Sequence, residues 1–167
     1  MHECDVITHM QPIITHLAEL LISRQHTLSV AESCTGGYLS KLCTDLAGSS
    51  EWFERGFITY SNQAKIDMLR VAPATISQYG AVSQETVTAM AQGALANSLA
   101  DCSIAISGVA GPGGATPLNP VGSVWFSWAQ RDHASMAKHQ LFAGDREAVR
   151  SQAVEFAIKQ LIELINQ

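Results

Sequence analysis

The chain has 167 residues, of which 47% are apolar and 15% charged, with a formal net charge of −5 and a mean hydropathy of +0.10. This composition excludes a disordered, collagen-like or polyelectrolyte chain, and the length allows one buried core without disulfides or a structural metal. There is no run of about 18 apolar residues for a membrane span, and the N-terminus lacks the basic and apolar regions of a signal peptide. We therefore expect one cytoplasmic domain over residues 1–167, without a membrane partner.

The cysteines and the charge distribution exclude two further classes of protein. Cys4, Cys34, Cys43 and Cys102 are scattered along the chain without the spacing of zinc ligands, which predicts reduced cysteines and no structural metal. An acidic chain with no basic run has no electrostatic footprint for a nucleic-acid backbone. Any phosphate that the protein binds is expected to be small and held by a few local groups.

Hydrophobic periodicity divides the chain into alternating helices and strands. The first half predicts a helix over 7–24, a strand over 27–31, a helix over 36–46, a strand over 56–60 and a helix over 62–69. The second half predicts a helix over 83–99 capped by Ser83, a strand over 102–107, a Gly/Pro-rich loop over 108–122, hairpin strands over 122–129 and 134–142, and a helix over 145–164. This order predicts an α/β fold, a single-domain three-layer α/β/α sandwich around a mixed sheet.

The segment 31–37 (AESCTGG) follows a strand and opens a helix. Unpaired N–H groups and the positive end of the helix dipole gather there, so the segment favours an anion or a developing oxyanion. Ser33 is placed much as a nucleophile elbow presents its serine above a sheet. The alternative is that Ser33 or Thr35 simply caps the helix, which is the commoner role for these residue types.

A second constellation, Tyr60-Ser61-Asn62 with Lys65, lies at another strand exit. Lys65 is one helical turn beyond Ser61 and therefore points back toward the end of the strand, so both strand exits can share one crevice. No histidine neighbours these motifs, whereas a desolvated lysine can lose its proton, which makes Ser33 with Lys65 the candidate dyad. The alternatives are a solvated helix lysine and, for Tyr60, either a proton-relaying hydroxyl or an ordinary strand aromatic.

Two more segments carry groups that can bind an anion. The loop from Ser107 to Gly114 is glycine-rich and follows a buried strand, and such loops form nests of backbone amides, although a long turn without a ligand is the alternative. Arg146 opens the last helix, where Asp145 is a natural N-cap. Arginine recognises phosphate by a two-pronged contact, while an exposed salt-bridging arginine is the simpler alternative.

Taken together, these segments resemble the single-domain form of the CinA C-terminal domain family. The resemblance is carried, in the family's order, by AESCTGG (31–37), FERGFITYSNQAK (53–65), YGAVSQETVTAMAQG (79–93), AISGVAGPGG (105–114), PVGSVW (120–125) and FAGDREAVR (142–150). Arg55 stands where many members have Gly, and Ser107 where many have Thr.

The resemblance implies hydrolysis of the carboxamide of nicotinamide mononucleotide (NMN) to nicotinate mononucleotide and ammonia, with no metal or organic cofactor. Ser33 would attack the amide carbon after Lys65, with Tyr60 as an optional relay, takes its proton. The amides around Thr35, Gly36 and Gly37 would stabilise the oxyanion. The ribose phosphate would be held by Ser107, Gly111, Gly113, Gly114 and Arg146. We also expect a homo-oligomer, a dimer or larger.

Two rival hypotheses stay open at this level. The first is a catalytically silent nucleotide-binding or interaction module that has kept the fold. The second is a thiol enzyme that uses Cys34, although no activating base for a thiol is evident in the sequence. The joint presence of Ser33, Tyr60 and Lys65 favours the amidohydrolase over the silent module.

Overall fold

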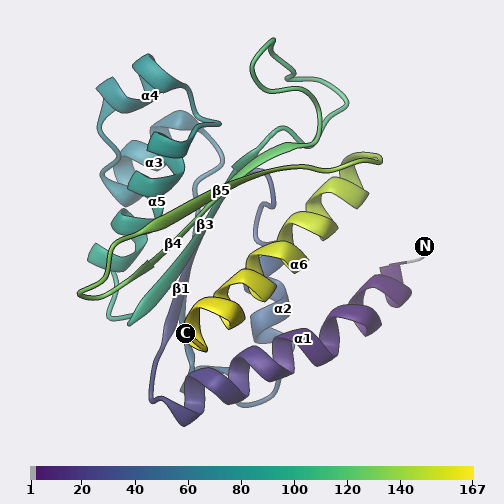
Figure 1. The fold of residues 1–167 in the computed structure, drawn as a ribbon, viewed down its shortest axis with the longest axis vertical. Coiled ribbons are helices and arrows are strands. Elements are labelled where there is room, and N and C mark those ends of the chain that lie inside the picture. The colour runs from purple at the N-terminus through teal and green to yellow at the C-terminus, as the bar shows by residue number, and fades with distance from the viewer. Residues whose placement is uncertain (1–2) are drawn as a thin grey trace.

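The computed structural model describes residues 3–167 and contains one five-stranded mixed sheet (Figure 1). The strands are β1 (Leu28–Glu32), β2 (Phe53–Ile58), β3 (Cys102–Gly108), β4 (Ser123–Gln130) and β5 (Met136–Leu141), in the order β2-β1-β3-β4-β5. β1 pairs in parallel with both β2 and β3, whereas β3, β4 and β5 pair antiparallel. The predicted α/β class and mixed sheet are therefore confirmed.

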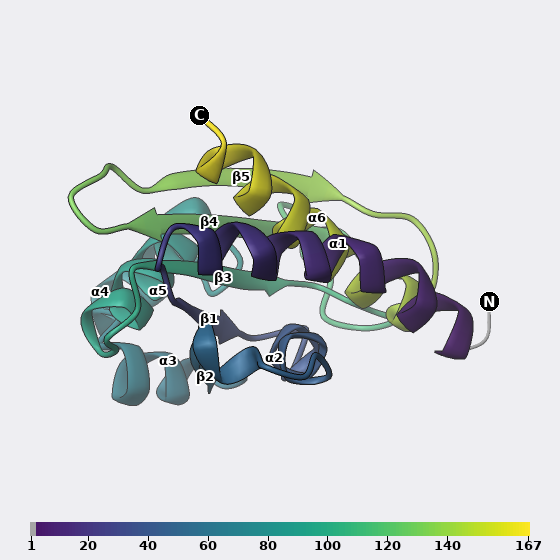
Figure 2. The ribbon, with the colours of Figure 1, turned by 90° about the horizontal axis from the view of Figure 1, so that it is seen from below.

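Helices cover both faces of this sheet (Figures 1 and 2). One face carries α1 (Glu3–Ser23), α2 (Tyr38–Thr44) and α6 (Arg146–Ile165), and the other carries α3 (Asn62–Leu69), α4 (Pro73–Tyr79) and α5 (Gln84–Ala96); a short 3₁₀ turn spans Ser49–Glu51. The three predicted layers are thus present. Within residues 3–167, no helix has the length and apolarity needed to cross a membrane.

The predicted cap of α5 is present, but the bounds of several helices and strands differ from the predicted ones. Ser83 Oγ accepts from the N–H of Thr86 at 3.2 Å and so caps α5, as predicted. The helix α2 begins two residues later than predicted, because Gly36 and Gly37 adopt left-handed backbone conformations with φ of 56° and 101°. The short helix α4, which has a proline at its first position, was not predicted, because seven residues are too few to show a helical period.

The edge strand β2 is displaced from its prediction. It starts at Phe53 rather than Gly56, and it ends at Ile58. The prediction missed the first three residues because charged residues interrupt the apolar run there. Its last pairing is with Glu32, the final residue of β1, because the chain then leaves the sheet in the turn that begins at Ser33. Tyr60 therefore lies beyond the strand and not within it, so it is not an ordinary strand aromatic.

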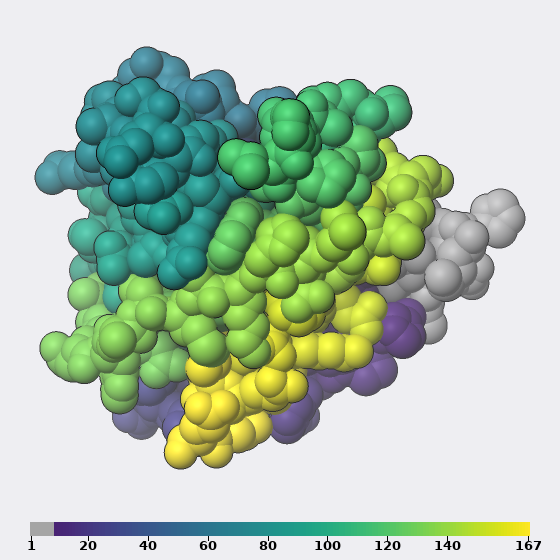
Figure 3. Space-filling view, turned by 45° about the horizontal axis from the view of Figure 1, so that its top comes forward, coloured from purple at the N-terminus to yellow at the C-terminus, as the bar shows by residue number. Residues whose placement is uncertain are grey.

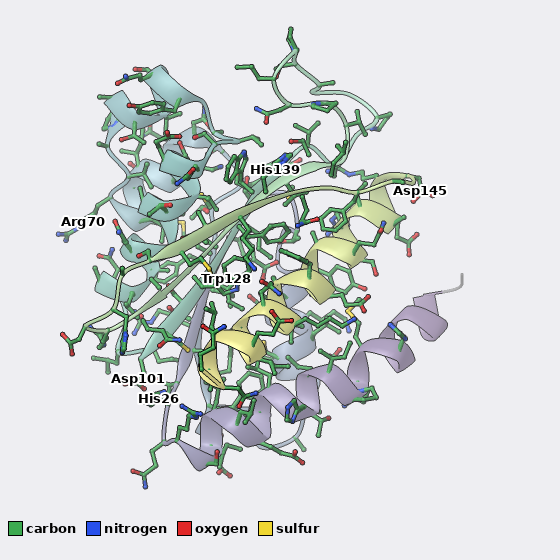
Figure 4. All side chains as sticks on the ribbon, in the orientation of Figure 1. His26, Arg70, Asp101, Trp128, His139 and Asp145 are labelled. Atoms are coloured by element: carbon green, nitrogen blue, oxygen red, sulfur yellow. The ribbon has the colours of Figure 1, made fainter. Side chains whose placement is uncertain are left out.

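Side-chain alternation along β4 divides the core between the two faces of the sheet. Phe126 and Trp128 face α6, where the indole N–H of Trp128 donates to the carbonyl of Ala157 at 3.0 Å (Figure 4). The opposite face is packed by smaller side chains from α5, including Met90 and Ala91 against Ala105 of β3. Both halves of the core are buried, so the sheet is a fixed platform for the groups at its carboxyl edge.

Parallel pairing sends the carboxyl ends of β1, β2 and β3 to one edge of the sheet. The segments that follow these three strands, and the loop over 109–122 that projects at the top of Figure 1, gather at this edge. In the space-filling view a hollow opens between the teal α3–α4 region and the green loop (Figure 3). In open α/β sheets, ligands bind in the crevice at such an edge.

Candidate active site

The hollow at the carboxyl edge is a cavity of about 310 Å³. Its wall is formed by the turn after β1, the segment from Tyr60 into α3, the loop after β3 and the start of α6, together with the connection between α4 and α5. The lining residues that the sequence singled out are Ser33, Cys34, Tyr60, Lys65, Ser107, Gly111, Gly113, Gly114 and Arg146. The two strand exits predicted to share one crevice therefore converge, and the loop after β3 and the start of α6 join them there.

Ser33 and Lys65 are in direct contact inside this cavity. Ser33 is the first residue after β1, and its Oγ lies 3.0 Å from the Nζ of Lys65. Lys65 comes from the first turn of α3, which is capped by Ser61 through a 3.0 Å hydrogen bond from the N–H of Ala64. The lysine is only 1% exposed, so it is not the solvated helix lysine of the alternative interpretation.

The ammonium of Lys65 lies among neutral oxygens. Nζ donates to the carbonyls of Thr59 at 2.9 Å and Tyr60 at 3.3 Å, and among the described residues it forms no ion pair. Burial lowers the pKa of Lys65 to about 8, and the nearby Cys34 offsets this only in part. A neutral amine has two N–H groups and one lone pair, so the two carbonyls take both N–H groups and leave the lone pair facing Ser33.

The phenol of Tyr60 lies away from this pair. The side chain is 62% exposed, and its hydroxyl accepts a 3.3 Å hydrogen bond from Arg146. Only the main-chain carbonyl of Tyr60 reaches Lys65. The direct contact between Lys65 and Ser33 leaves no gap for the expected hydroxyl relay, so Tyr60 belongs to the rim of the cavity.

The turn after Ser33 offers a different set of amides from the predicted one. The N–H of Gly36 donates to the carbonyl of Ser33 at 3.1 Å, and the N–H of Gly37 donates to the carboxylate of Glu32 at 3.1 Å. Across residues 3–167, the N–H groups of Cys34 and Thr35 donate to no other residue. The expectation for Gly36 and Gly37 as oxyanion donors is therefore wrong, since their hydrogens are already engaged.

Glu32 is a residue that the sequence reasoning missed. It is fully buried, and besides the N–H of Gly37 its carboxylate accepts from the N–H of Leu39 at 3.1 Å and from both the N–H and the hydroxyl of Ser40 at 2.8 Å. Glu32, rather than Ser33 or Thr35, thus accepts hydrogen bonds from the otherwise unpaired N–H groups at the start of α2. The available signal was an acidic residue that directly precedes a strand-to-helix turn.

Arg146 joins the wall of the cavity to the loop that covers it. Its guanidinium donates to the carbonyl of Gly111 at 2.8 Å and to the hydroxyl of Tyr60 at 3.3 Å. Asp145 caps α6 through a 2.9 Å bond from the N–H of Ala148, as predicted. The Ser107 hydroxyl donates to the carbonyl of Ala81 at 2.7 Å, which ties β3 to the connection before α5.

Arg150 lies one turn further along α6 than Arg146 and was not among the residues predicted for the site. Its Nε donates to the carbonyl of Cys34 at 3.1 Å, and one terminal nitrogen donates to the carbonyl of Thr35 at 2.8 Å. The guanidinium also lies over the ring of Tyr38, 5.9 Å from its centroid. Arg150 and Arg146 line a second, larger cavity of about 580 Å³ on the outer side of the turn.

The thiol of Cys34 is placed poorly for catalysis. Burial and, to a smaller extent, the nearby carboxylate of Glu32 raise its pKa to about 12, so the thiol stays protonated near neutral pH. Cys43 and Cys102 are buried as well. In the part of the chain that the structure describes, no three His, Cys, Asp or Glu side chains are grouped closely enough to hold a metal ion.

Comparisons with known proteins agree with this arrangement. The model of the CinA C-terminal domain family matches residues 10–165. The nicotinamide-nucleotide amidohydrolase PncC of Escherichia coli K12 is 46% identical over 154 residues, which cover 92% of this chain and 93% of that protein. PncC of Pseudomonas putida is 46% identical over 158 residues, or 93% and 98% of the two chains. The crystal structure of competence damage-inducible protein A (ComA) from Klebsiella pneumoniae superposes with a TM-score of 0.91 at 37% identity, over 95% of this chain and 98% of that one.

Proposed function

Because the chain belongs to the CinA C-terminal domain family, as its sequence motifs predicted, we propose that it hydrolyses the amide of NMN to give nicotinate mononucleotide and ammonia. Relatives named nicotinamide-nucleotide amidohydrolase match it along nearly their whole length. The observation that carries the proposal is the buried contact between Ser33 and Lys65 in a cavity at the edge of the sheet.

The first step is attack by Ser33 on the carboxamide carbon. The lone pair of neutral Lys65 accepts the hydroxyl proton while Oγ forms a bond to that carbon, and the carbonyl electron pair moves onto the amide oxygen. The N–H groups of Cys34 and Thr35 are the donors proposed for this oxygen, because no other residue within 3–167 accepts from them. One such donor contributes roughly 3 to 4 kcal/mol in comparable acyl-transfer sites.

The same lysine then serves as the acid. When the oxyanion collapses, the carbon–nitrogen bond breaks, and the ammonium of Lys65 gives its proton to the departing nitrogen, which leaves as ammonia. An ester of nicotinate mononucleotide remains on Ser33. Water attacks this ester while Lys65 again takes a proton, and the return of that proton to Ser33 Oγ releases the product.

The phosphate of the substrate is assigned to the rim of the cavity. Arg146 is the charged group there, and Gly113 and Gly114 line the same wall. A guanidinium binds a phosphate by charge-assisted hydrogen bonds, which add affinity without taking part in the reaction. Ser107 completes the wall with a hydroxyl whose hydrogen is already donated to Ala81.

The test is the release of ammonia from NMN by the purified protein, assayed with a chelator present and followed together with the formation of nicotinate mononucleotide. We expect the two products in equal amounts. Binding of NMN without turnover would support the silent module instead. Release of ammonia from free nicotinamide but not from NMN would overturn the assignment of the nucleotide as substrate.

A further inference from the structure

We infer that Arg150 is a positioning residue for the oxyanion site, because it holds the peptide between Cys34 and Thr35 so that the N–H of Thr35 stays directed at the developing negative charge. The inference rests on the proposed amidohydrolase function. Arg150 acts through the turn and not on the substrate, and nothing in the sequence motifs assigned it this role.

The contacts of Arg150 all involve the turn that follows the nucleophile. Nε and one terminal nitrogen bind two consecutive carbonyls, those of Cys34 and Thr35, at 3.1 and 2.8 Å. A planar guanidinium with two parallel donors fixes both the distance and the direction of such a pair. The guanidinium carbon also lies over the ring of Tyr38, 5.9 Å from the ring centroid, which adds a cation–π contact.

These contacts determine the direction in which the N–H of Thr35 points. The carbonyl of Cys34 and the N–H of Thr35 belong to one trans peptide, so they point in opposite directions. When Arg150 holds this carbonyl on the side of α6, the N–H of Thr35 is directed away from α6. The neighbouring donor, the N–H of Cys34, is fixed separately, because the carbonyl of its own peptide accepts from Gly36.

Glu32 and Arg150 bind different main-chain groups of the turn: the carboxylate accepts from N–H groups, and the guanidinium donates to carbonyls. Glu32 takes the N–H of Gly37 and the first amides of α2, while Arg150 takes the carbonyls of Cys34 and Thr35. A hydrogen bond to a peptide carbonyl also polarises the N–H of the same peptide and strengthens it as a donor. Arg150 is therefore expected to matter most when the oxyanion forms, and less when the substrate only binds.

The competing role for Arg150 is a direct contact with the substrate phosphate. It lines the outer cavity together with Lys41 and Arg146, so this role makes a different kinetic prediction. A phosphate contact raises KM for NMN and leaves nicotinamide riboside, which lacks the phosphate, unaffected. A positioning role lowers kcat for both substrates.

The experiment compares Arg150→Met with a matched control, Arg131→Met. Arg131 likewise donates to two main-chain carbonyls, those of Leu95 at 3.3 Å and Ser98 at 3.1 Å, but it lies outside the cavity wall. We expect Arg150→Met to lower kcat about 10²-fold for both NMN and nicotinamide riboside with KM changed less than about threefold. Arg131→Met is expected to keep the kcat of the wild type.

A wild-type kcat in Arg150→Met, or a rise of KM confined to NMN, would overturn the inference. If Arg150→Met does not fold, Arg150→Lys decides the question, because one ammonium cannot hold both carbonyls in the same plane. A fall in its kcat of about tenfold or more supports the positioning role, and an unchanged kcat overturns it. The wild-type protein is assayed first, so that an absence of turnover refutes the proposed function and is not mistaken for an effect of Arg150.

Discussion

Lys65 combines two properties that a general base at neutral pH needs. It is buried against main-chain carbonyls and without a carboxylate partner, which lowers its pKa toward the working range, and it touches the hydroxyl that it must deprotonate. A lysine on the surface of α3 would have neither property. The proposed chemistry therefore depends on the packing around one nitrogen atom.

This view of Lys65 predicts how activity depends on pH. The neutral amine is the active form, and its fraction rises as the pH passes the lysine's pKa of about 8, so kcat/KM of the wild type is expected to rise with pH along a limb centred there. Lys65→Met is expected to lower kcat at least about 10²-fold and to lose this limb. The measurement is the pH profile of ammonia release for both proteins.

Lys65→Arg is the control for charge at this position. A guanidinium does not give up its proton near neutral pH, so this variant is expected to be as slow as Lys65→Met. An active Lys65→Arg protein would show that the position supplies only positive charge, and that water or another group takes the proton.

At the scale of elements, the start of α6 serves the site through residues one turn apart. Arg146 faces the inner cavity and the loop at Gly111, whereas Arg150 holds the turn after Ser33. Asp145 fixes the first turn of the helix by capping it, so both arginines are carried on a rigid element. In the middle of the same helix, Phe156 packs against Phe126 and Trp128 of β4.

The assignment of Arg146 to the phosphate makes a prediction for two substrates. Arg146→Ala is expected to raise KM for NMN about tenfold or more with little change in kcat, because a charge-assisted contact far from the scissile amide stabilises ground and transition states alike. Nicotinamide riboside, without the phosphate, is expected to lose much less. Steady-state kinetics on both substrates measure this difference.

Equal losses for the two substrates would contradict the phosphate assignment. They would instead make Arg146 a structural residue that joins α6 to the loop through the carbonyl of Gly111. The unfolding midpoint of the variant, measured alongside, shows how much this contact contributes to stability.

At the scale of the whole molecule, the sheet order accounts for where the cavity lies. Three adjacent parallel strands bring their carboxyl ends to one edge, and the antiparallel hairpin of β4 and β5 extends the sheet on the side of β3. The loop between β3 and β4 then closes over that edge (Figure 1). Residues separated by more than 100 positions, such as Ser33 and Arg146, meet there as a result.

Much of this arrangement could be predicted from the sequence, because hydrophobic periodicity identifies the long helices and the buried strands. The contact between Ser33 and Lys65 could be predicted as well, because both residues follow strands that end at one edge of the sheet. The sequence did not predict which amides of the turn stay free, because this depends on the hydrogen bonds that Glu32 and Arg150 form with the turn. Such contacts arise from tertiary packing and leave no local pattern.

The measurement that tests the account most directly is the rate of ammonia release from NMN by Ser33→Ala, beside wild type and Cys34→Ala. We expect Ser33→Ala to lose at least about 10⁴-fold in kcat with an intact fold, because the variant has no atom to form the ester. Cys34→Ala, which removes the adjacent buried thiol, is expected to stay within about threefold of wild type. Turnover by Ser33→Ala within about tenfold of wild type, or loss of turnover in a folded Cys34→Ala protein, would contradict the assignment of Ser33 as the nucleophile.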